Sequence, residues 1–107
     1  MDMDVPMADG ALAQSRDENW EKCRSADTGA ADAHDVIAGC TALIQSRRET
    51  AKDLAVAFRN RGLGYILEKQ YELAIRDLNQ AIRLDPGDST AAARRGFGHL
   101  GEYPAQS

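Results

Sequence analysis

The sequence has no apolar run that approaches the roughly 20 residues needed to span a membrane as a helix. Only 6% of its 107 residues are aromatic, and its net charge of −4 includes no basic excess. The lack of a long apolar run argues against a membrane-spanning protein, and the lack of a basic excess argues against nucleic acid as a partner. The chain length fits one domain.

Residues that carry enzyme chemistry are also scarce. The two histidines, His34 and His99, have no cysteine or pair of acids at metal-ligand spacing. Gly62-Leu63-Gly64 lies inside a helical pattern with no strand before it, so it is not expected to bind phosphate. The sequence therefore predicts no catalytic residues, no metal site and no cofactor.

A strong helical pattern is present between Leu54 and Pro86. Apolar and small residues recur there every three or four positions in two runs, separated by a polar break at Lys69 and Gln70. This spacing is typical of two amphipathic helices. Because few residues join them, the helices are expected to be antiparallel neighbours. The proline predicts the end of the second helix.

Small residues occur where two such helices would cross. Gly62 lies in the middle of the first run, where glycine costs about 1 kcal/mol relative to alanine. That cost is expected where another backbone must come close. Ala74 and Ala81 lie on the inner face of the second run. They would leave room for Phe58 and Tyr65 between the helices.

This stretch resembles the tetratricopeptide repeat, a helix-turn-helix unit of roughly 34 residues. The resemblance implies an all-α fold in which antiparallel helical hairpins stack as a short right-handed solenoid of about five helices. Arg61 is a departure, because the family usually has leucine there. If Ala55 opens the repeat, the residues on characteristic family positions are Phe58, Gly62, Tyr65, Ala74, Leu78, Ala81 and Pro86.

Weaker helical patterns on both sides continue the same period. The helix that follows Asp32, its expected N-cap, has an apolar stripe one repeat period before that of the second central helix. Gly96 lies one period after Gly62. A helix beginning at Asp88 or Ser89 is therefore expected to open a further repeat.

The expected domain boundaries follow from these patterns. Neither end of the chain has a helical period, and Pro104 should prevent another helix from forming after residue 100. The expected organisation is a disordered tail over 1–15, a repeat domain over 16–100 and a disordered tail over 101–107. Within the domain, we expect a degenerate helical hairpin over 16–50, the complete repeat over 55–88 and a partial repeat or capping helix over 89–100.

Two cysteines, Cys23 and Cys40, lie on the two expected helices of the first hairpin. The residues alone allow two small apolar core side chains or a disulfide across the hairpin. Trp20 and the cysteine pair, followed by the repeat, resemble a group of exported bacterial tetratricopeptide proteins with a cysteine pair before their repeats. That resemblance favours the disulfide and an oxidising compartment.

The N-terminal stretch contains an incomplete targeting pattern. Ala11-Leu12-Ala13 resembles the end of a secretory signal, but the basic start and apolar core of such a signal are absent. Two interpretations stay open: an alanine-rich tail, or a chain whose true start lies upstream. The family resemblance favours a periplasmic or secreted location over a cytoplasmic one.

The resemblance also implies a non-catalytic protein-protein interaction module. In this family the first helix of each repeat lines a concave groove that holds a partner peptide or helix. Asn60 and Arg94 match part of the carboxylate clamp of some members, whereas Thr90 and Ser25 stand where lysines would be needed. The residues expected to face the groove are Arg59, Asn60, Leu63, Arg94 and Phe97.

This groove is expected to prefer acidic-hydrophobic ligands, because arginines lie beside apolar side chains. Two alternatives stay open. One is that the arginines, including Arg61 and Arg95, form a solvated basic face without a specific ligand. The other is that the chain is a truncated docking or regulatory fragment of a larger tetratricopeptide protein or enzyme complex.

Overall fold

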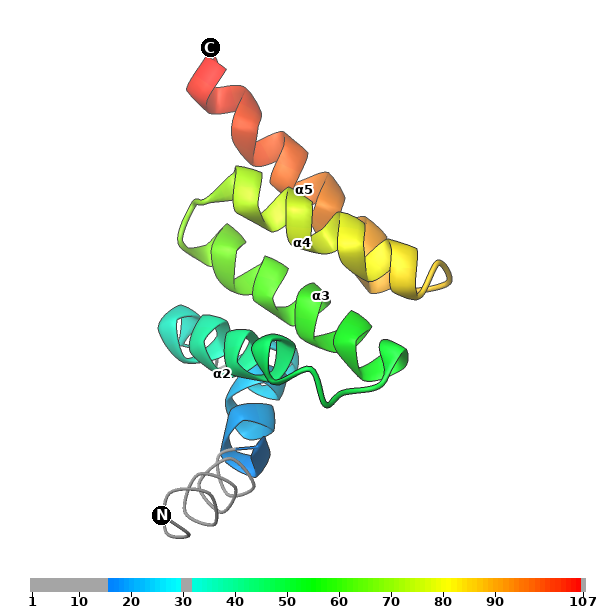
Figure 1. Cartoon of the computed structure of the whole chain (residues 1–107). Helices are drawn as coiled ribbons and strands as arrows, with labels where there is room; N and C mark the ends of the chain where they lie inside the picture. Colours follow the sequence, from blue (N-terminus) through cyan, green and yellow to red (C-terminus); the bar gives the residue numbers. More distant parts are fainter. Residues whose placement is uncertain (1–15, 30–31, 107) are drawn as a thin grey trace, which may run out of the picture.

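The computed structural model describes residues 16–29 and 32–106. Residues 16–24 are helical and lead into the short 3-10 helix η1 (Ser25–Asp27). The longer helices are α2 (Ala33–Ser46), α3 (Ala51–Leu67), α4 (Tyr71–Leu84) and α5 (Ser89–Gln106). Each of them packs on the next in chain order, as Figure 1 shows. The described part of the chain contains no strand, and the predicted all-α arrangement of stacked helices is confirmed.

Helices α2, α3 and α5 begin where the sequence places side-chain caps. The Asp32 carboxylate accepts a hydrogen bond from the backbone N–H of His34 at 2.8 Å, which caps α2. The Thr50 hydroxyl accepts from the N–H of Asp53 at 3.1 Å, which caps α3. Asp88 caps α5 in the same way. These bonds satisfy N–H groups that have no partner inside the helix.

The crossing of α3 and α4 depends on small residues. A Cβ atom added to Gly62 would lie 2.7 Å from Cγ of Leu78, so no larger residue fits without a shift. Ala74 and Ala81 are fully buried on α4. Phe58 packs from α3 against the cluster that contains Leu78 and Ala81. The predicted close approach of the two helices at these positions is confirmed.

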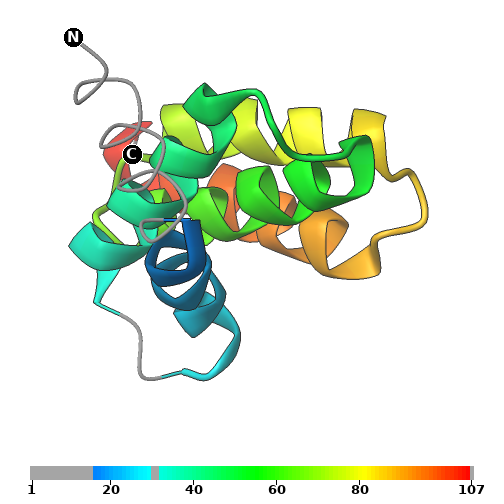
Figure 2. The same cartoon turned by 60° about the horizontal axis from the view of Figure 1, so that its bottom comes forward.

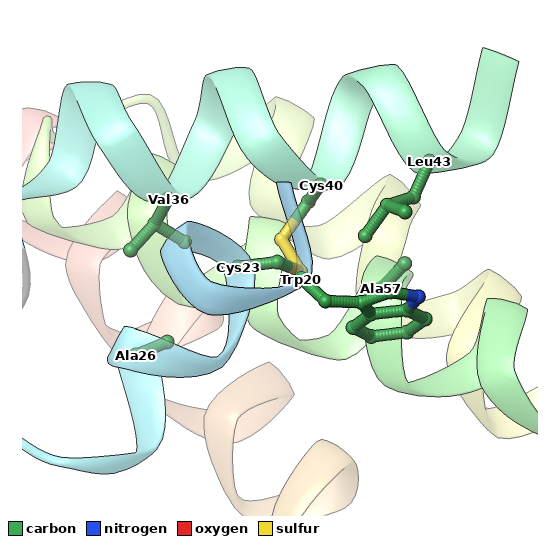
Figure 3. Packing of buried hydrophobic residues seen from close by; sticks show 7 residues of the cluster. All are labelled: Trp20, Cys23, Ala26, Val36, Cys40, Leu43 and Ala57. Carbon is green, nitrogen blue, oxygen red and sulfur yellow. A yellow bond between two sulfur atoms is a disulfide. The ribbon is translucent and has the colours of Figure 1, made fainter. Parts of the chain in front are cut away.

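The N-terminal helical segment (residues 16–24) is fixed to α2 by a second core. The Cys23 and Cys40 sulfurs form a disulfide of 2.03 Å, which confirms the pairing that the resemblance favoured. Figure 3 shows Trp20, Val36 and Leu43 packed around this bond.

The segment runs across α2 rather than alongside it, which is visible in both Figure 1 and Figure 2. The backbones come close at Gly39, where an added Cβ would lie 2.6 Å from the carbonyl oxygen of Asn19. A crossing at one glycine, rather than along a face, explains why this hairpin lacks the repeat pattern.

Removing the disulfide is expected to destabilise the fold by about 3 kcal/mol, because the bond closes a loop between residues 17 apart. Urea melts of the Cys23→Ala/Cys40→Ala variant should show a lower midpoint than the oxidised parent. Dithiothreitol should lower the parent's midpoint by a similar amount and leave the variant unchanged. A variant that melts with the oxidised parent would contradict a stabilising role for the bond.

The last helix differs from its expected end at residue 100, because α5 continues to Gln106. Gly98 and Gly101 explain the extension. Both face α4: a Cβ at either position would meet Ile75 or the ring of Tyr71. This packing supports α5 beyond residue 100, and Pro104 removes only one backbone bond near the helix end. The predicted tail over 1–15 lies outside the described residues.

Candidate functional site

Two arginines from different helices converge on one carboxylate. Arg59 extends from α3 and Arg94 from α5, and Asp27 lies at the end of η1. Oδ1 of Asp27 lies 3.6 Å from Nη2 of Arg59 and 3.7 Å from Nη2 of Arg94. The arginine side chains are only 18% and 15% exposed, whereas the aspartate is 44% exposed. With Asn60, these residues are called the arginine site below.

Asn60 connects the parts of the arginine site. Its side chain is fully buried, and its Nδ2 donates to the carbonyl oxygen of Cys23 at 3.0 Å and to Oδ2 of Asp27 at 3.4 Å. Its Oδ1 accepts from Nε of Arg59 at 3.2 Å and from Nη1 of Arg94 at 3.0 Å. The amide thus uses both its donor and acceptor sides, and it fixes the N-terminal segment, α3 and α5 relative to one another.

The positive charge of Arg94 is largely buried, and nearby negative charges balance it only in part. Burial lowers the pKa of its guanidinium, and the positive charge of Arg59 lowers it further, while Asp27 and Asp88 offset part of the effect. The group stays charged at neutral pH, because arginine has a very high pKa. A further carboxylate near Arg94 would therefore stabilise its charged form.

Asp88 orders the arginine site from the turn before α5. Its Oδ2 accepts from Nη1 of Arg59 at 3.0 Å, and its side chain is 8% exposed. Burial alone would raise the pKa of Asp88, but hydrogen bonds from the N–H of Ala91, from Arg59 and from the N–H of Thr90 lower it overall. The folded state therefore favours the ionised carboxylate.

The charge of Asp88 is expected to stabilise the protein by roughly 1–3 kcal/mol at neutral pH. Because its folded-state pKa is lowered, this stability is present above the unfolded pKa near 4 and is lost as the pH falls through the folded pKa. Asp88→Asn keeps a capping oxygen but removes the charge. It should lower the melting temperature clearly at pH 7 and much less at pH 3. Equal losses at both pH values would contradict this account.

The apolar part of the expected groove is smaller than the sequence predicted. Phe97 lies one turn after Arg94 on α5 and is 63% exposed. Leu63 is half-buried and packs against the cluster around the disulfide, so it does not offer a free apolar surface. Phe97 is thus the apolar side chain exposed beside the arginine site.

Arg61 has a different role from the arginines of the arginine site. It binds the Asp77 carboxylate of α4 through two bonds of 2.6 and 2.8 Å, and its Nη1 donates to the hydroxyl of Thr41 on α2 at 3.2 Å. The two paired side chains are 17% and 7% exposed. Its guanidinium also lies 5.6 Å from the ring centres of Phe58 and Tyr65.

The expectation of a solvated basic face is therefore wrong for Arg59, Arg61 and Arg94, which are largely buried and bonded. Sequence reasoning also missed the pair of Arg61 and Asp77. The sequence did contain a signal for this ion pair. Arg61 stands where the family usually has leucine, and it lies opposite Asp77 on the buried stripe of the next helix. Opposite charges on facing buried positions indicate an ion pair.

Other kinds of site are not supported by the described residues. No group of three or more potential metal ligands is found among them. None of their helices combines the length and apolar character that a membrane span requires. An open hollow of about 720 Å³ borders the N-terminal helical segment, between Arg24 and Asp53. Its lining comes from residues 16–28 and from Asp53 of α3, and it includes no residue of the arginine site.

Comparison with known families fixes the nature of the central hairpin. Residues 55–88 match the family model of the tetratricopeptide repeat, and they cover α3 from Ala55 onward, α4 and the turn after α4. The chain contains a tetratricopeptide repeat. The matched residues are those predicted from Ala55 onward. No curated protein and no solved structure gives a significant match to the chain.

The tetratricopeptide repeat accounts for about a third of the chain. Such repeats are in general protein-protein interaction modules, and the family is generally non-catalytic. Arg59 and Asn60 lie on the first helix of this tetratricopeptide repeat, whereas Asp27 and Arg94 come from the elements before and after it. The arginine site thus lies where η1 and α5 each contact α3.

Proposed function

We propose that the protein is an adaptor whose arginine site holds an acidic group of a partner protein. In this proposal, Phe97 contacts an apolar side chain next to that acidic group. The observation that supports it is the carboxylate of Asp27, which two guanidinium groups and the Asn60 amide already surround. A carboxylate from a partner would meet the same donors.

Asp27 itself is a weak competitor for such a ligand. Its contacts with the two arginines, at 3.6 and 3.7 Å, are longer than direct hydrogen bonds, and its side chain is 44% exposed. Because Asp27 is exposed to water and its contacts are long, each ion pair is expected to be weak and to approach the roughly 0–1 kcal/mol of exposed pairs. A partner carboxylate that makes direct bonds to Arg94 would therefore displace Asp27 at small cost.

The affinity is expected to be modest. One charge-assisted contact contributes roughly 1.5–3 kcal/mol, and a short stack offers few further contacts. We expect dissociation constants on the order of micromolar or weaker. A partner segment that is acidic and apolar together should bind better than one with either property alone, because it can contact Arg94 and Phe97 at once.

The test is an array of acidic-hydrophobic peptides, followed by titration of the best binder. Arg94→Glu and Arg59→Glu should weaken binding by roughly ten- to hundredfold, since each loses a charge-assisted contact. Asp27→Asn should strengthen binding, because it removes the competing carboxylate. Arg83→Glu changes charge by the same amount on an exposed position of α4 and serves as the matched control.

Circular dichroism of each variant separates lost binding from lost folding, and Arg94→Gln is a milder variant if Arg94→Glu unfolds. An Arg83→Glu effect as large as that of Arg94→Glu would mean diffuse electrostatic attraction, and the arginine site would not be the binding site. Weaker binding by Asp27→Asn would also contradict the proposal, because it would make Asp27 part of the receptor.

A further inference from the structure

The surface on α3 that receives α4 recurs, without an occupant, on α5. On α3 this surface consists of Phe58, Gly62 and Ile66. Phe58 and Ile66 pack against a cluster that contains Leu78 and Ala81 of α4 and also Ala91 of α5, and Gly62 lies against Leu78. The residues one repeat period later are Ala92, Gly96 and Leu100, all on α5. They are called the α5 face below.

The α5 face is open to solvent. A Cβ added to Gly96 meets no atom within 4 Å, whereas one added to Gly62 would lie 2.7 Å from Leu78. Leu100 is 62% exposed and Ala92 is exposed as well. In the described part of the chain, α5 packs only on α4 and α3, and α5 is the last helix of the stack (Figure 1). A glycine in a helix interior lowers helix stability relative to alanine, and at Gly96 no contact among the described residues compensates for it.

An arginine beside the α3 surface also recurs beside the α5 face, one repeat period later. Arg61 donates backward to Thr41 on α2 through Nη1 and forward to Asp77 on α4 through its other nitrogens. Arg95, one period later, donates backward to Oδ1 of Asn79 on α4 through Nη1 at 3.1 Å. Among the side chains that the structure describes, which lie in residues 16–29 and 32–101, no carboxylate forms an ion pair with Arg95. An acid placed relative to Arg95 as Asp77 is placed relative to Arg61 would lie on a helix that covers the α5 face.

We propose that the α5 face binds an amphipathic helix of another protein that has the pattern of α4. In that pattern, a leucine is preceded directly by an acid and flanked by alanines four residues before and three residues after it. On α4 these residues are Ala74, Asp77, Leu78 and Ala81. The leucine packs over Gly96, the alanines allow the close approach of the two helices, and the acid binds Arg95. This surface is separate from the arginine site and takes a helix rather than an acidic extended segment.

A peptide with the sequence of α4 can serve as the probe for the α5 face. A fluorescent peptide of residues 70–86, which contains α4 and its flanking residues, is titrated with the full chain and followed by anisotropy. We expect saturable binding in the micromolar to submillimolar range, since an isolated helix of this length is marginally stable. A peptide carrying Leu78→Arg should bind at least tenfold more weakly.

Variants of the chain locate the binding. Gly96→Gln should weaken peptide binding at least tenfold without lowering the melting temperature, because the added side chain meets open space in the free protein. Thr90→Gln places the same side chain on another exposed part of α5 and is the matched control. Arg95→Glu should weaken binding of the parent peptide, and a peptide with Asp77→Lys should restore it.

The possible results divide clearly. Peptide binding that is unchanged by both Gly96→Gln and Arg95→Glu, or no saturation at millimolar protein, would overturn the proposal. Sedimentation that shows a dimer of the chain, abolished by Gly96→Gln, would also overturn it, since the α5 face would then pair with a second copy. Arg94→Glu should leave binding of the α4 peptide unchanged, so failure of the arginine site and failure of the α5 face are told apart.

Discussion

Replacing Ala74 with arginine is expected to unfold the domain. Ala74 is fully buried on α4. It lies on the face of α4 that packs where Gly62 of α3 already leaves no space for a Cβ. A long cationic side chain there would force the helices apart or bury a charge without a partner, and such changes cost on the order of 4–5 kcal/mol or more. That amount approaches the whole stability of a typical small domain.

Urea melts followed by circular dichroism measure this effect. Gln80→Arg adds the same side chain at an exposed position of α4 and should melt within about 0.5 kcal/mol of the parent. Arg76→Ala, on the exposed side of the same helix, should also change little. An Ala74→Arg protein with the parent's midpoint would mean that α3 and α4 do not cross as described.

Replacing Asp77 with alanine is expected to cost roughly 3–5 kcal/mol, because it leaves the guanidinium of Arg61 buried without its carboxylate. The two side chains are only 17% and 7% exposed and are joined by two short bonds. In the parent, hydrogen bonding to Asp77 raises the pKa of Arg61. The variant loses this effect, but the intrinsic pKa of arginine is so high that Arg61 still cannot escape the penalty by losing its proton near neutral pH. The loss should appear as a large drop in the urea midpoint.

A double-mutant cycle identifies the cause of that loss. Arg61→Leu introduces the residue that the tetratricopeptide family usually has at this position. Combined with Asp77→Ala, it removes both charges, and the double variant should be clearly more stable than Asp77→Ala alone. Additive losses in the cycle would show that packing of the individual side chains, and not the ion pair, determines the cost.

The fold was predictable where the signals are local. Gly62, Ala74, Ala81 and Pro86 lie within one period, and each follows from helix geometry or from proline chemistry, so the hairpin of α3 and α4 could be derived in register. The end of α5 could not, because Gly101 packs against Tyr71 of a different helix. That contact outweighs the helix-breaking tendency of the proline beyond it.

The candidate site was predictable only in part. The spacing from Gly62 and Gly96 placed Arg59, Asn60 and Arg94 on corresponding faces, and the structure brings these three together. The approach of Asp27 could not be derived, because the crossing of the first hairpin does not follow the repeat register. Because the sequence did not reveal the ion pairs with Asp27, Arg59 and Arg94 could be interpreted as a solvated basic surface.

Two contacts hold Cys23 in place, and they also restrict the position of Asp27, four residues later in the chain. Its sulfur is bound covalently to α2, and its carbonyl oxygen accepts from the buried Asn60 of α3. If the hydrogen bond opens, the disulfide keeps η1 close by, so Asp27 remains at a high effective concentration around Arg59 and Arg94. Under the proposed function, a partner carboxylate would therefore compete with a tethered group rather than with a free one. The length and stiffness of the chain between Cys23 and Asp27 would then help to set the ligand concentration at which a partner occupies the arginine site.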